Sequence, residues 1–451
     1  MIGKSPTADV DTAIRRLASL VHGVKTRAPS GRLTAVSGTL LRVDVPLARI
    51  GEICELRDPD GGTSMFGEVV SIDGTTAHLA PYGATEGLSH RTEVIALGRS
   101  PGLMVGNGLL GLVTDAFGKP LQRMADAPVR IEGAIDSWRT LNSNPPDPLD
   151  RKPIDRPFLI GVRSVDGIIT SGQGQRIGIF GSAGAGKSSL ISQIVKGCDA
   201  DVCVVALIGE RGREVGDFIR RTIGPERADR TCLVVSTSDR PPIERVQASL
   251  TATTIAEYYS DLGLRVLLVI DSITRLARAL RDIGLSAGEP PTRRGFPPSV
   301  FSALPRLFER SGSGSRGSIT AFYTVLVEGD ATSDPIAEET RSLLDGHIVL
   351  SNKLAEAGHF PAIDILDSRS RVMEHVVDKS HVRDAARLRE LVSKYREVEL
   401  LIQVGEYKRG GDPTADEAVD KIDAINAFLR QDSDDITPLS ETRAALRALV
   451  G

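Results

Sequence analysis

The chain contains a glycine-rich loop that strongly restricts the folds it can adopt. Residues 178–190 read GIFGSAGAGKSSL, in which GSAGAGKS matches the pattern GxxxxGK[ST]. The loop follows the apolar segment QRIGIF and opens a helical pattern, and this strand–loop–helix order indicates a phosphate-binding P-loop. Its glycines let backbone N–H groups turn towards phosphate oxygens, and the helix start adds a partial positive charge. The sequence therefore predicts a nucleotide-binding α/β core.

Residues of the P-loop have distinct expected roles. Lys187 is expected to reach the β- and γ-phosphates, and the Ser188 hydroxyl is expected to ligate Mg²⁺. These roles predict a bound nucleotide with β- and γ-phosphates, together with Mg²⁺. The predicted nucleotide-binding residues are Gly181, Ser182, Ala183, Gly184, Ala185, Gly186, Lys187, Ser188 and Ser189.

A second candidate metal ligand ends a later apolar segment. RVLLVIDS carries Asp271 where a strand would reach the carboxyl edge of the sheet. Ligands of α/β sheets gather at this edge, and a carboxylate there can hold the hydration shell of Mg²⁺. Many apolar strands end in an aspartate, so this pattern alone is a weak signal. It becomes informative here because a P-loop lies upstream.

A third segment, LIGERGREV, places Glu210 and Arg211 directly after another apolar strand. A carboxylate at this edge can orient the water that attacks the γ-phosphorus, and an adjacent arginine can neutralise charge that develops on the phosphate. The alternative is a solvent-exposed cluster in which these two side chains pair with Arg213 and Glu214.

Periodicity divides the rest of the chain into regions of different character. Short segments separated by Gly, Asp and Pro over 32–98 predict short antiparallel strands in a small β-barrel or sandwich, of which we favour the barrel. Apolar strands alternate with helical stretches from 158 to 350, which favours a parallel sheet covered on both faces. After residue 378 the pattern is helical. The predicted boundaries are 1–30 for an amphipathic segment, 31–99 for the barrel, 100–377 for the nucleotide-binding domain and 378–451 for a helical domain.

Composition argues against nucleic-acid binding and against membrane insertion. The formal net charge of -4 gives no global attraction to nucleic acid. Residues 31–100 hold six basic against nine acidic residues, and their only aromatics are Phe66 and Tyr82, which opposes an RNA-binding barrel. Apolar runs such as VLLVI are far below the roughly 18 residues that cross a bilayer. We therefore expect a cytoplasmic protein.

Taken together, the motifs resemble those of hexameric ATPases related to the catalytic subunit of rotary ATP synthases. The segments GSAGAGKSSL, GERGREV, VLLVIDSITRLARA, GEPPTRRGFPPSVF, GSITAFYTVLVEGD and LDSRSRVM carry this resemblance, which runs from about residue 32 to about residue 430. Within that family the chain most resembles bacterial type III secretion and flagellar protein-export ATPases, chiefly in GEPPTRRGFPPSVFSALPRLFERSG and LRELVSKYREVELLIQVGEYKRG. The resemblance implies a RecA-like core and Mg²⁺-dependent ATP hydrolysis by a homohexameric ring that energises protein export.

The family's roles can be carried onto matching positions. Glu210 would be the carboxylate that activates water, Arg211 would contact the γ-phosphate, and Asp271 would be the Walker B acid. The P-loop ends in KSSL where relatives often have KSTL, a departure at Ser189 that lies just past the magnesium ligand. The sequence does not place the adenine pocket, because DKSHVRDAARL at the start of the helical region offers no clear aromatic.

An arginine late in the chain completes the implied site. Arg371 matches the arginine of the family's SxSR motif, which reaches across a subunit interface and stabilises the γ-phosphate in the transition state. Such an arginine finger is worth about 10³–10⁵ in rate. The alternative for Arg371 is a local salt bridge with Asp364 or Asp367. Arg369 has no such match and is expected at the surface.

The resemblance also implies partners. They are further copies of the chain in a hexamer with shared active sites, a central stalk protein, a peripheral regulator or stator protein, and export chaperone–substrate complexes; through them the ring would be peripheral to the inner membrane. Residues 9–24 predict an amphipathic helix that packs on its own domain or docks a partner. The Gly/Pro-rich residues 282–298 predict a long loop that either faces the channel or packs between subunits.

Three other classes stay open from the sequence. A catalytic subunit of a rotary ATP synthase or ion pump would need a second, non-catalytic chain. An RNA-translocating ring helicase is opposed by the acidic barrel, and a non-enzymatic nucleotide-binding assembly protein is opposed by Glu210 and Arg371. The stretch LLIQVGEYKRGGDP favours an injection-type system over a flagellar one.

Overall fold

The chain forms two compact units, Met1–Pro101 and Gly102–Gly451. The computed structural model describes four stretches of it, residues 30–58, 64–124, 137–327 and 334–451. The amphipathic helix expected over 9–24 lies outside the described residues. Within these stretches, no helix is both long enough and apolar enough to cross a bilayer.

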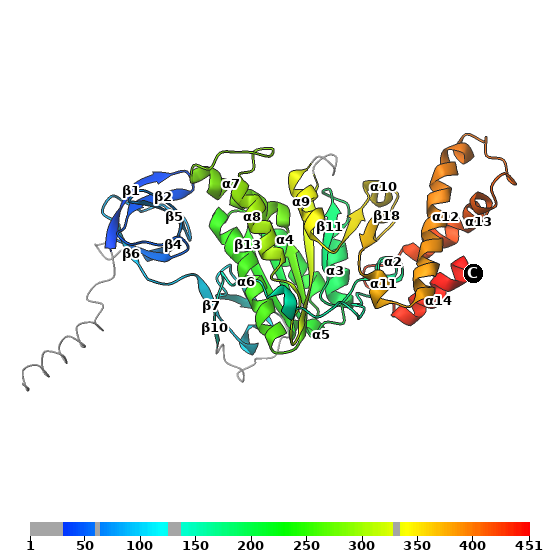
Figure 1. The fold of residues 1–451 in the computed structure, drawn as a ribbon, viewed down its shortest axis with the longest axis horizontal. Helices are drawn as coiled ribbons and strands as arrows, with labels where there is room; N and C mark the ends of the chain where they lie inside the picture. The colour runs from blue at the N-terminus through cyan, green and yellow to red at the C-terminus, as the bar shows by residue number, and fades with distance from the viewer. Residues whose placement is uncertain (1–29, 59–63, 125–136, 328–333) are drawn as a thin grey trace, which may run out of the picture. The chain divides into compact units, whose positions relative to one another are not determined.

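The first unit contains a closed β-barrel, as the sequence predicted (Figure 1). Its strands follow the order β1-β2-β5-β4-β3-β6, and every neighbouring pair is antiparallel. Their bounds are β1 (Ser30–Ser37), β2 (Leu40–Asp44), β3 (Ile53–Arg57), β4 (Ser64–Asp73), β5 (Thr76–Pro81) and β6 (Glu93–Ala96). Leu41, Leu56, Leu79 and Val94 are among the buried residues that fill the interior. Closure pairs every strand on both sides, so no edge is left to aggregate.

The second unit is organised around a ten-stranded sheet in the order β18-β17-β11-β16-β14-β12-β13-β8-β9, with β15 paired to β16. The strands are β8 (Leu112–Thr114), β9 (Pro120–Arg123), β11 (Arg176–Gly181), β12 (Val202–Glu210), β13 (Thr231–Thr237), β14 (Arg265–Asp271), β15 (Gly312–Ser313), β16 (Ser318–Leu326), β17 (Gly346–Leu350) and β18 (Ile363–Ser370). Pairing is parallel from β17 through β8 and antiparallel at the three outer additions, β9, β15 and β18. A separate ribbon pairs β7 (Gly102–Val105) with β10 (Ser137–Thr140).

Both faces of this sheet are buried, which explains its continuous apolar strands. Along β12, Val205 and Leu207 belong to one core cluster, whereas Val204 and Ala206 belong to the other. The first face is covered by α2 (Arg163–Ile168), α3 (Lys187–Gly197) and α4 (Gly212–Thr222). The second is covered by α6 (Pro242–Asp261), α7 (Ile273–Ser286), α8 (Pro298–Phe308) and α9 (Pro335–Leu343). The α/β prediction with a parallel-sheet core is therefore confirmed.

Short helices complete the connections of the second unit. They are η1 (Asn107–Leu109), η2 (Pro148–Asp150), α5 (Pro225–Ala228), α10 (Asn352–Glu356) and α11 (Met373–Val376). The loop expected over 282–298 is shorter than predicted, because α7 continues to Ser286 and α8 begins at Pro298. The first five residues of the predicted loop, 282–286, are instead the last residues of α7.

The C-terminal region is helical, as predicted, and contains α12 (Lys379–Gln403), α13 (Pro413–Leu429) and α14 (Leu439–Val450) (Figure 1). Asp378 caps α12 by accepting from the N–H groups of Ser380 and His381. Asp412 caps α13 in the same way, with Pro413 at the first helical position. Helix α14 is an element that the sequence interpretation did not single out. Its Leu446 joins the same core cluster as Leu388 of α12.

Candidate active site

The P-loop lies between the end of β11 at Gly181 and the start of α3 at Lys187. Gly184 and Gly186 have φ angles of +86° and +87°, a left-handed conformation that glycine adopts without a Cβ penalty. No side chain caps α3. Its first N–H groups are therefore available to an anion, and the helix dipole favours negative charge there.

Lys187, at the start of α3, and Asp271, at the end of β14, come together at the carboxyl edge of the sheet. The Lys187 Nζ lies 3.8 Å from Asp271 Oδ1, and both side chains are buried. Thr324 of β16 donates to the same Oδ1 at 2.5 Å and fixes the carboxylate. Burial lowers the pKa of Lys187, while Asp271 and Glu210 act in the opposite direction. The pair places a cation and a carboxylate where a phosphate and its metal would meet.

Glu210 ends β12 and is held by Arg275 of α7. The Arg275 Nη2 donates to Glu210 Oε2 at 3.2 Å, and its Nε lies 3.1 Å from Oε1. Burial raises the pKa of Glu210 to about 8, with further contributions from Glu214 and Asp271, although Arg275 opposes the shift. A carboxyl with this pKa exchanges a proton near neutral pH, a property suited to a general base.

Arg211 has a different environment from its neighbour. It precedes α4, its side chain is 80% exposed, and its Nη1 lies 3.7 Å from Glu214 Oε1. Arg213 likewise pairs along α4, with Asp217. The surface cluster considered as an alternative is therefore realised for Arg211, whereas Glu210 points to Arg275 and the pocket.

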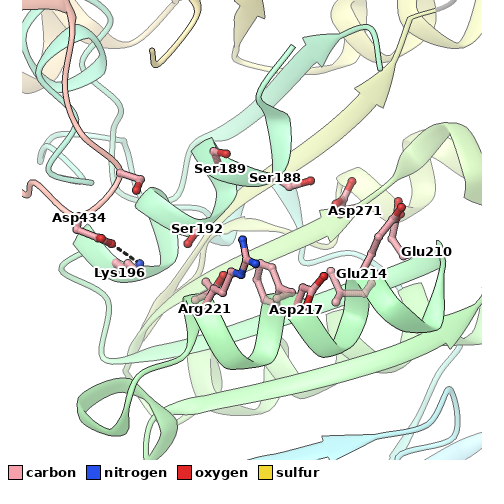
Figure 2. Close-up of a pocket in the computed structure, with 14 residues that line it drawn as sticks. Ser188, Ser189, Ser192, Lys196, Glu210, Glu214, Asp217, Arg221, Asp271 and Asp434 are labelled. Carbon is pink, nitrogen blue, oxygen red and sulfur yellow. Dashed lines mark hydrogen bonds and ion pairs between the residues drawn. The ribbon is translucent and has the colours of Figure 1, made fainter. Parts of the chain in front are cut away.

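A pocket of about 600 Å³ brings the predicted residues together (Figure 2). Ser188, Glu210 and Asp271 all line it. Figure 2 shows a row of polar side chains along α4 at one wall, Glu214, Asp217 and Arg221. At the other end, Lys196 of α3 pairs with Asp434 at 2.6 Å, so the segment between α13 and α14 also contributes to the wall.

The oxygen donors of the pocket suit a Mg²⁺ ion whose other ligands are waters and phosphate oxygens. Among the described residues, no group of three or more His, Cys, Asp or Glu is arranged to hold a metal. Ser188 supplies one hydroxyl and Asp271 one carboxylate to the same pocket. Mg²⁺ commonly keeps several waters and is bound by one or two protein oxygens plus phosphate oxygens.

A second pocket of about 520 Å³ adjoins the P-loop and was missed from the sequence. Its lining includes Gly186, Phe360 and Gln431. The Phe360 ring is 45% exposed, and a Cβ added at Gly186 would meet its Cε1 at 3.3 Å. Ser189 and Ser433 line both pockets, which makes the two continuous along α3. The available signal was an aromatic–proline pair, Phe360 and Pro361, just before a strand.

Arg371 lies apart from both pockets. It follows β18, is exposed, and its backbone N–H donates to Asp345 O at 3.0 Å. No carboxylate of the described residues pairs with its guanidinium. The expected alternative with Asp364 does not form, because Arg396 donates to that carboxylate at 2.8 Å. Within its own chain, Arg371 therefore has no anionic partner among the residues that the structure describes.

Comparisons with known proteins agree with this geometry. The nucleotide-binding domain of the ATP synthase alpha/beta family matches residues 161–370, and that family's β-barrel domain matches 33–98. The T3SS EscN ATPase C-terminal domain matches 377–448. The type 3 secretion system ATPase of Sinorhizobium fredii is 52% identical and covers 96% of this chain and 95% of its own. The flagellum-specific ATP synthase of Bacillus subtilis is 44% identical and covers 93% and 95%.

Solved structures give the same answer. EscN from enteropathogenic E. coli, described as the assembled ATPase of a type III secretion system, matches with a TM-score of 0.88 at 46% identity, over 93% of this chain and 100% of that one. EscN in complex with its central stalk EscO matches with a TM-score of 0.84, at the same identity and coverage. Fold and site thus define a P-loop nucleotide hydrolase built on a RecA-like sheet. The chain belongs to the family of type III secretion and flagellar export ATPases, and it is an ATPase of protein export.

Proposed function

We propose that the chain hydrolyses Mg²⁺–ATP by in-line attack of water, at a site assembled from two copies of the chain. One observation carries this proposal. Lys187 contacts Asp271, and Asp271 and Glu210 line one pocket, whereas Arg371 lies outside that pocket without an anionic partner among the described residues. One chain thus contains a cation, a candidate metal ligand and a candidate base for phosphate chemistry. The positive charge that would stabilise the γ-phosphate in the transition state would come from Arg371 of a neighbouring chain.

The P-loop and its neighbours would bind the phosphates and the metal. Backbone N–H groups of residues 181–189 surround the phosphates, and Lys187 contacts the β- and γ-phosphates. Ser188 and Asp271 would hold Mg²⁺, which supplies charge neutralisation at the β- and γ-oxygens when bound. Both side chains line the pocket, which supports the assignment.

Glu210 would accept a proton from the attacking water. Its Oε1 and Oε2 are oriented by Arg275, and its carboxyl faces the pocket that Asp271 also lines. Arg211 would contact the γ-phosphate once nucleotide is present. Its exposed side chain, paired with Glu214 at 3.7 Å, is free to reorient at little cost.

The adenine ring would stack on Phe360. The ring is exposed on one side and lies beside Gly186, in a pocket that continues from the phosphate site. Aromatic stacking of this kind is worth about 1–3 kcal/mol per base. The linker that contains Gln431 lines the same pocket and would close over the base.

The chain would form a homohexamer with shared sites, and the isolated position of Arg371 supports a site shared between chains. The relative EscN is described as an assembled ATPase and has been solved with a central stalk, EscO, which supports an oligomer and a stalk partner for this chain. A peripheral regulator or stator protein and chaperone–substrate complexes are further proposed partners. Through them the ring would sit at the cytoplasmic face of the inner membrane.

An injection-type system is favoured over a flagellar one. Relatives from Sinorhizobium fredii and Xanthomonas euvesicatoria, at 52% and 50% identity, are named type 3 secretion system ATPases, whereas the Bacillus subtilis flagellar relative is 44% identical. The domain division at 1–30, 31–99, 100–377 and 378–451 also remains our proposal. The family matches at 33–98 and 377–448 support its inner boundaries.

The test is the rate of phosphate release from ATP as the chain concentration is raised, with assembly followed by sedimentation. The specific activity should rise as rings form, and should disappear when Mg²⁺ is chelated. Full specific activity in samples that contain only monomer would overturn the proposal, because a monomer cannot supply Arg371 to its own pocket.

A further inference from the structure

Strand β18, which leads to Arg371, makes a tight turn at a bulge over residues 364–368. Strand β18 pairs with β17 at two places, Arg369 with His347 and Asp364 with Val349. Two residue steps on β17 therefore face five steps on β18. Residues 365–368, which lie opposite the single residue Ile348 of β17, form a bulge directly before Arg369, and a bulge of this kind re-aims the side chains that follow it.

Asp364 organises the interior of this turn. Its Oδ1 accepts from the N–H groups of Leu366 and Asp367 at 3.0 and 3.3 Å. Its carbonyl oxygen accepts from Ser368 Oγ at 2.5 Å, and Ser368 Oγ accepts from the N–H of Val349 at 2.9 Å. Asp364 and Ser368 are buried. The turn therefore has one hydrogen-bonded arrangement that both residues define.

Two arginines of helix α12 hold this turn from the helical region. The Arg396 Nη2 donates to Asp364 Oδ2 at 2.8 Å, and the Arg389 Nη2 donates to Ser368 O at 2.8 Å. The first of these bonds joins opposite charges at a buried carboxylate, and charge-assisted hydrogen bonds are stronger than neutral ones. Both ends of the turn are thus attached to one helix.

Arg371 has no comparable anchor of its own. Its N–H donates to Asp345 O, which continues the strand after the turn, and its guanidinium has no ion-pair partner in the described parts of the chain. Arg389 and Arg371 line the same surface pocket of about 390 Å³. The direction in which Arg371 projects therefore depends on the backbone that the turn delivers.

We infer that Arg389 and Arg396 are positioning residues that aim Arg371 at the neighbouring chain's nucleotide, through the turn at Asp364 and Ser368. This inference rests on the role proposed above for Arg371. It adds that α12, and with it the C-terminal helices, sets the geometry of a site on another chain. A movement of α12 would then change ATP hydrolysis at the neighbouring chain's site through the hydrogen bonds that Arg389 and Arg396 donate.

The first measurement compares steady-state kinetics of the double variant Arg389→Ala/Arg396→Ala with those of wild type. We expect kcat to fall by about 10- to 100-fold, because a misplacement of about 1 Å costs on this scale. The KM for ATP should not change, since both nucleotide pockets of each chain are intact. The variant Arg396→Lys, which keeps a cation for Asp364, should recover most of the rate.

Arg387→Ala is the matched control on the same helix. Arg387 donates to Glu390 at 2.7 Å and to Glu417 of α13, so its contacts stay within the helical region. Arg387→Ala should retain the kcat of wild type, although its loss of thermal stability should be comparable to that of the double variant. Equal losses of kcat in the control and the double variant would overturn the inference, because the effect would then follow from disturbance of the helices alone.

A mixing experiment separates positioning from general damage. The double variant keeps an intact P-loop pocket, so rings that mix it with Lys187→Ala should regain activity, with Lys187→Ala supplying a properly held Arg371. Rings that mix it with Arg371→Ala should be no more active than the double variant alone, because every finger is then defective. Recovery in the second mixture would overturn the inference. Failure of Lys187→Ala with Arg371→Ala to recover in co-assembled rings would instead refute the shared site.

Discussion

Arg275 Nη2 donates to Glu210 Oε2 at 3.2 Å, and this contact orients the carboxyl that lines the pocket beside the P-loop. Arg275 lies in α7, which follows β14, and Glu210 ends β12, the strand that pairs with β14. Asp271 at the end of β14 pairs with Leu207 of β12, so Arg275, one helical turn further on, reaches the end of β12. Glu210 is thereby oriented by a side chain of a neighbouring helix. Its proposed role is to take a proton from water, and the first two predictions test this role.

Glu210→Gln should bind ATP and fail to hydrolyse it. The amide keeps a hydrogen bond to Arg275 and the shape of the pocket, but it cannot accept a proton. General base catalysis contributes about 10²–10⁴-fold, and kcat should fall by this factor with little change in nucleotide affinity. Steady-state kinetics and fluorescent-nucleotide binding measure the two quantities. Glu397→Gln, at a surface residue that pairs with Lys394, should behave as wild type; undiminished turnover in Glu210→Gln would assign the base elsewhere.

The pH dependence of kcat/KM should follow the ionisation of Glu210. Burial raises the pKa of this carboxyl to about 8, so below that pH most molecules hold a proton on the base. Activity should therefore fall about tenfold for each unit of pH below the midpoint. Arg275→Ala removes the cation that favours the charged carboxylate and should move the midpoint to higher pH. A profile that is flat from pH 6 to 8 would contradict the assignment.

Phe360→Ala should weaken nucleotide binding far more than it slows the chemical step. Loss of a stacked base costs about 1–3 kcal/mol, which raises KM for ATP by about 5- to 100-fold. Phe360→Tyr keeps the ring and should retain a KM near that of wild type. The measurement is KM and kcat for the two variants. Equal KM values in Phe360→Ala and wild type would place the base outside the pocket beside Gly186.

Asp166 should make the stability of the second unit decrease as pH rises. This fully buried carboxyl accepts from the N–H groups of Ile160 and Gly161, yet burial raises its pKa to about 7. A raised folded-state pKa contributes stability below the unfolded pKa, and that contribution is lost as pH rises towards 7. Between pH 5.5 and 8 the loss is about 2 kcal/mol. Urea unfolding should show this decline in wild type and not in Asp166→Asn; parallel curves would contradict it.

Local geometry made part of the site predictable. The P-loop pattern specifies a backbone conformation, and Gly184 and Gly186 adopt the left-handed angles that it requires. Asp271 and Glu210 follow apolar strands, and parallel strands bring their carboxyl ends to one edge. Motif and periodicity were therefore sufficient for the sheet, the phosphate loop and the two carboxylates.

Contacts between distant segments could not be predicted in this way. Phe360 reaches Gly186 only because β18 and β11 flank β17 in the sheet. Asp364 was considered as a partner for Arg371. It is instead held by Arg396 of α12, which lies 32 positions later in the chain. Such pairings depend on strand order and helix placement, which no local pattern encodes. The sequence consequently indicated candidate residues for the chemistry and left open which residues position them.

The most direct test of the shared site is ATP hydrolysis by a mixture of Lys187→Ala and Arg371→Ala, compared with each variant alone and with co-assembly verified by differently tagged chains. Each variant should be inactive by itself. In random rings about one interface in four pairs an intact P-loop with an intact arginine from the adjacent chain, so activity should return to a substantial fraction of wild type. If the mixed rings form and remain inactive, Arg371 does not complete a neighbour's site, and the shared-site mechanism is wrong.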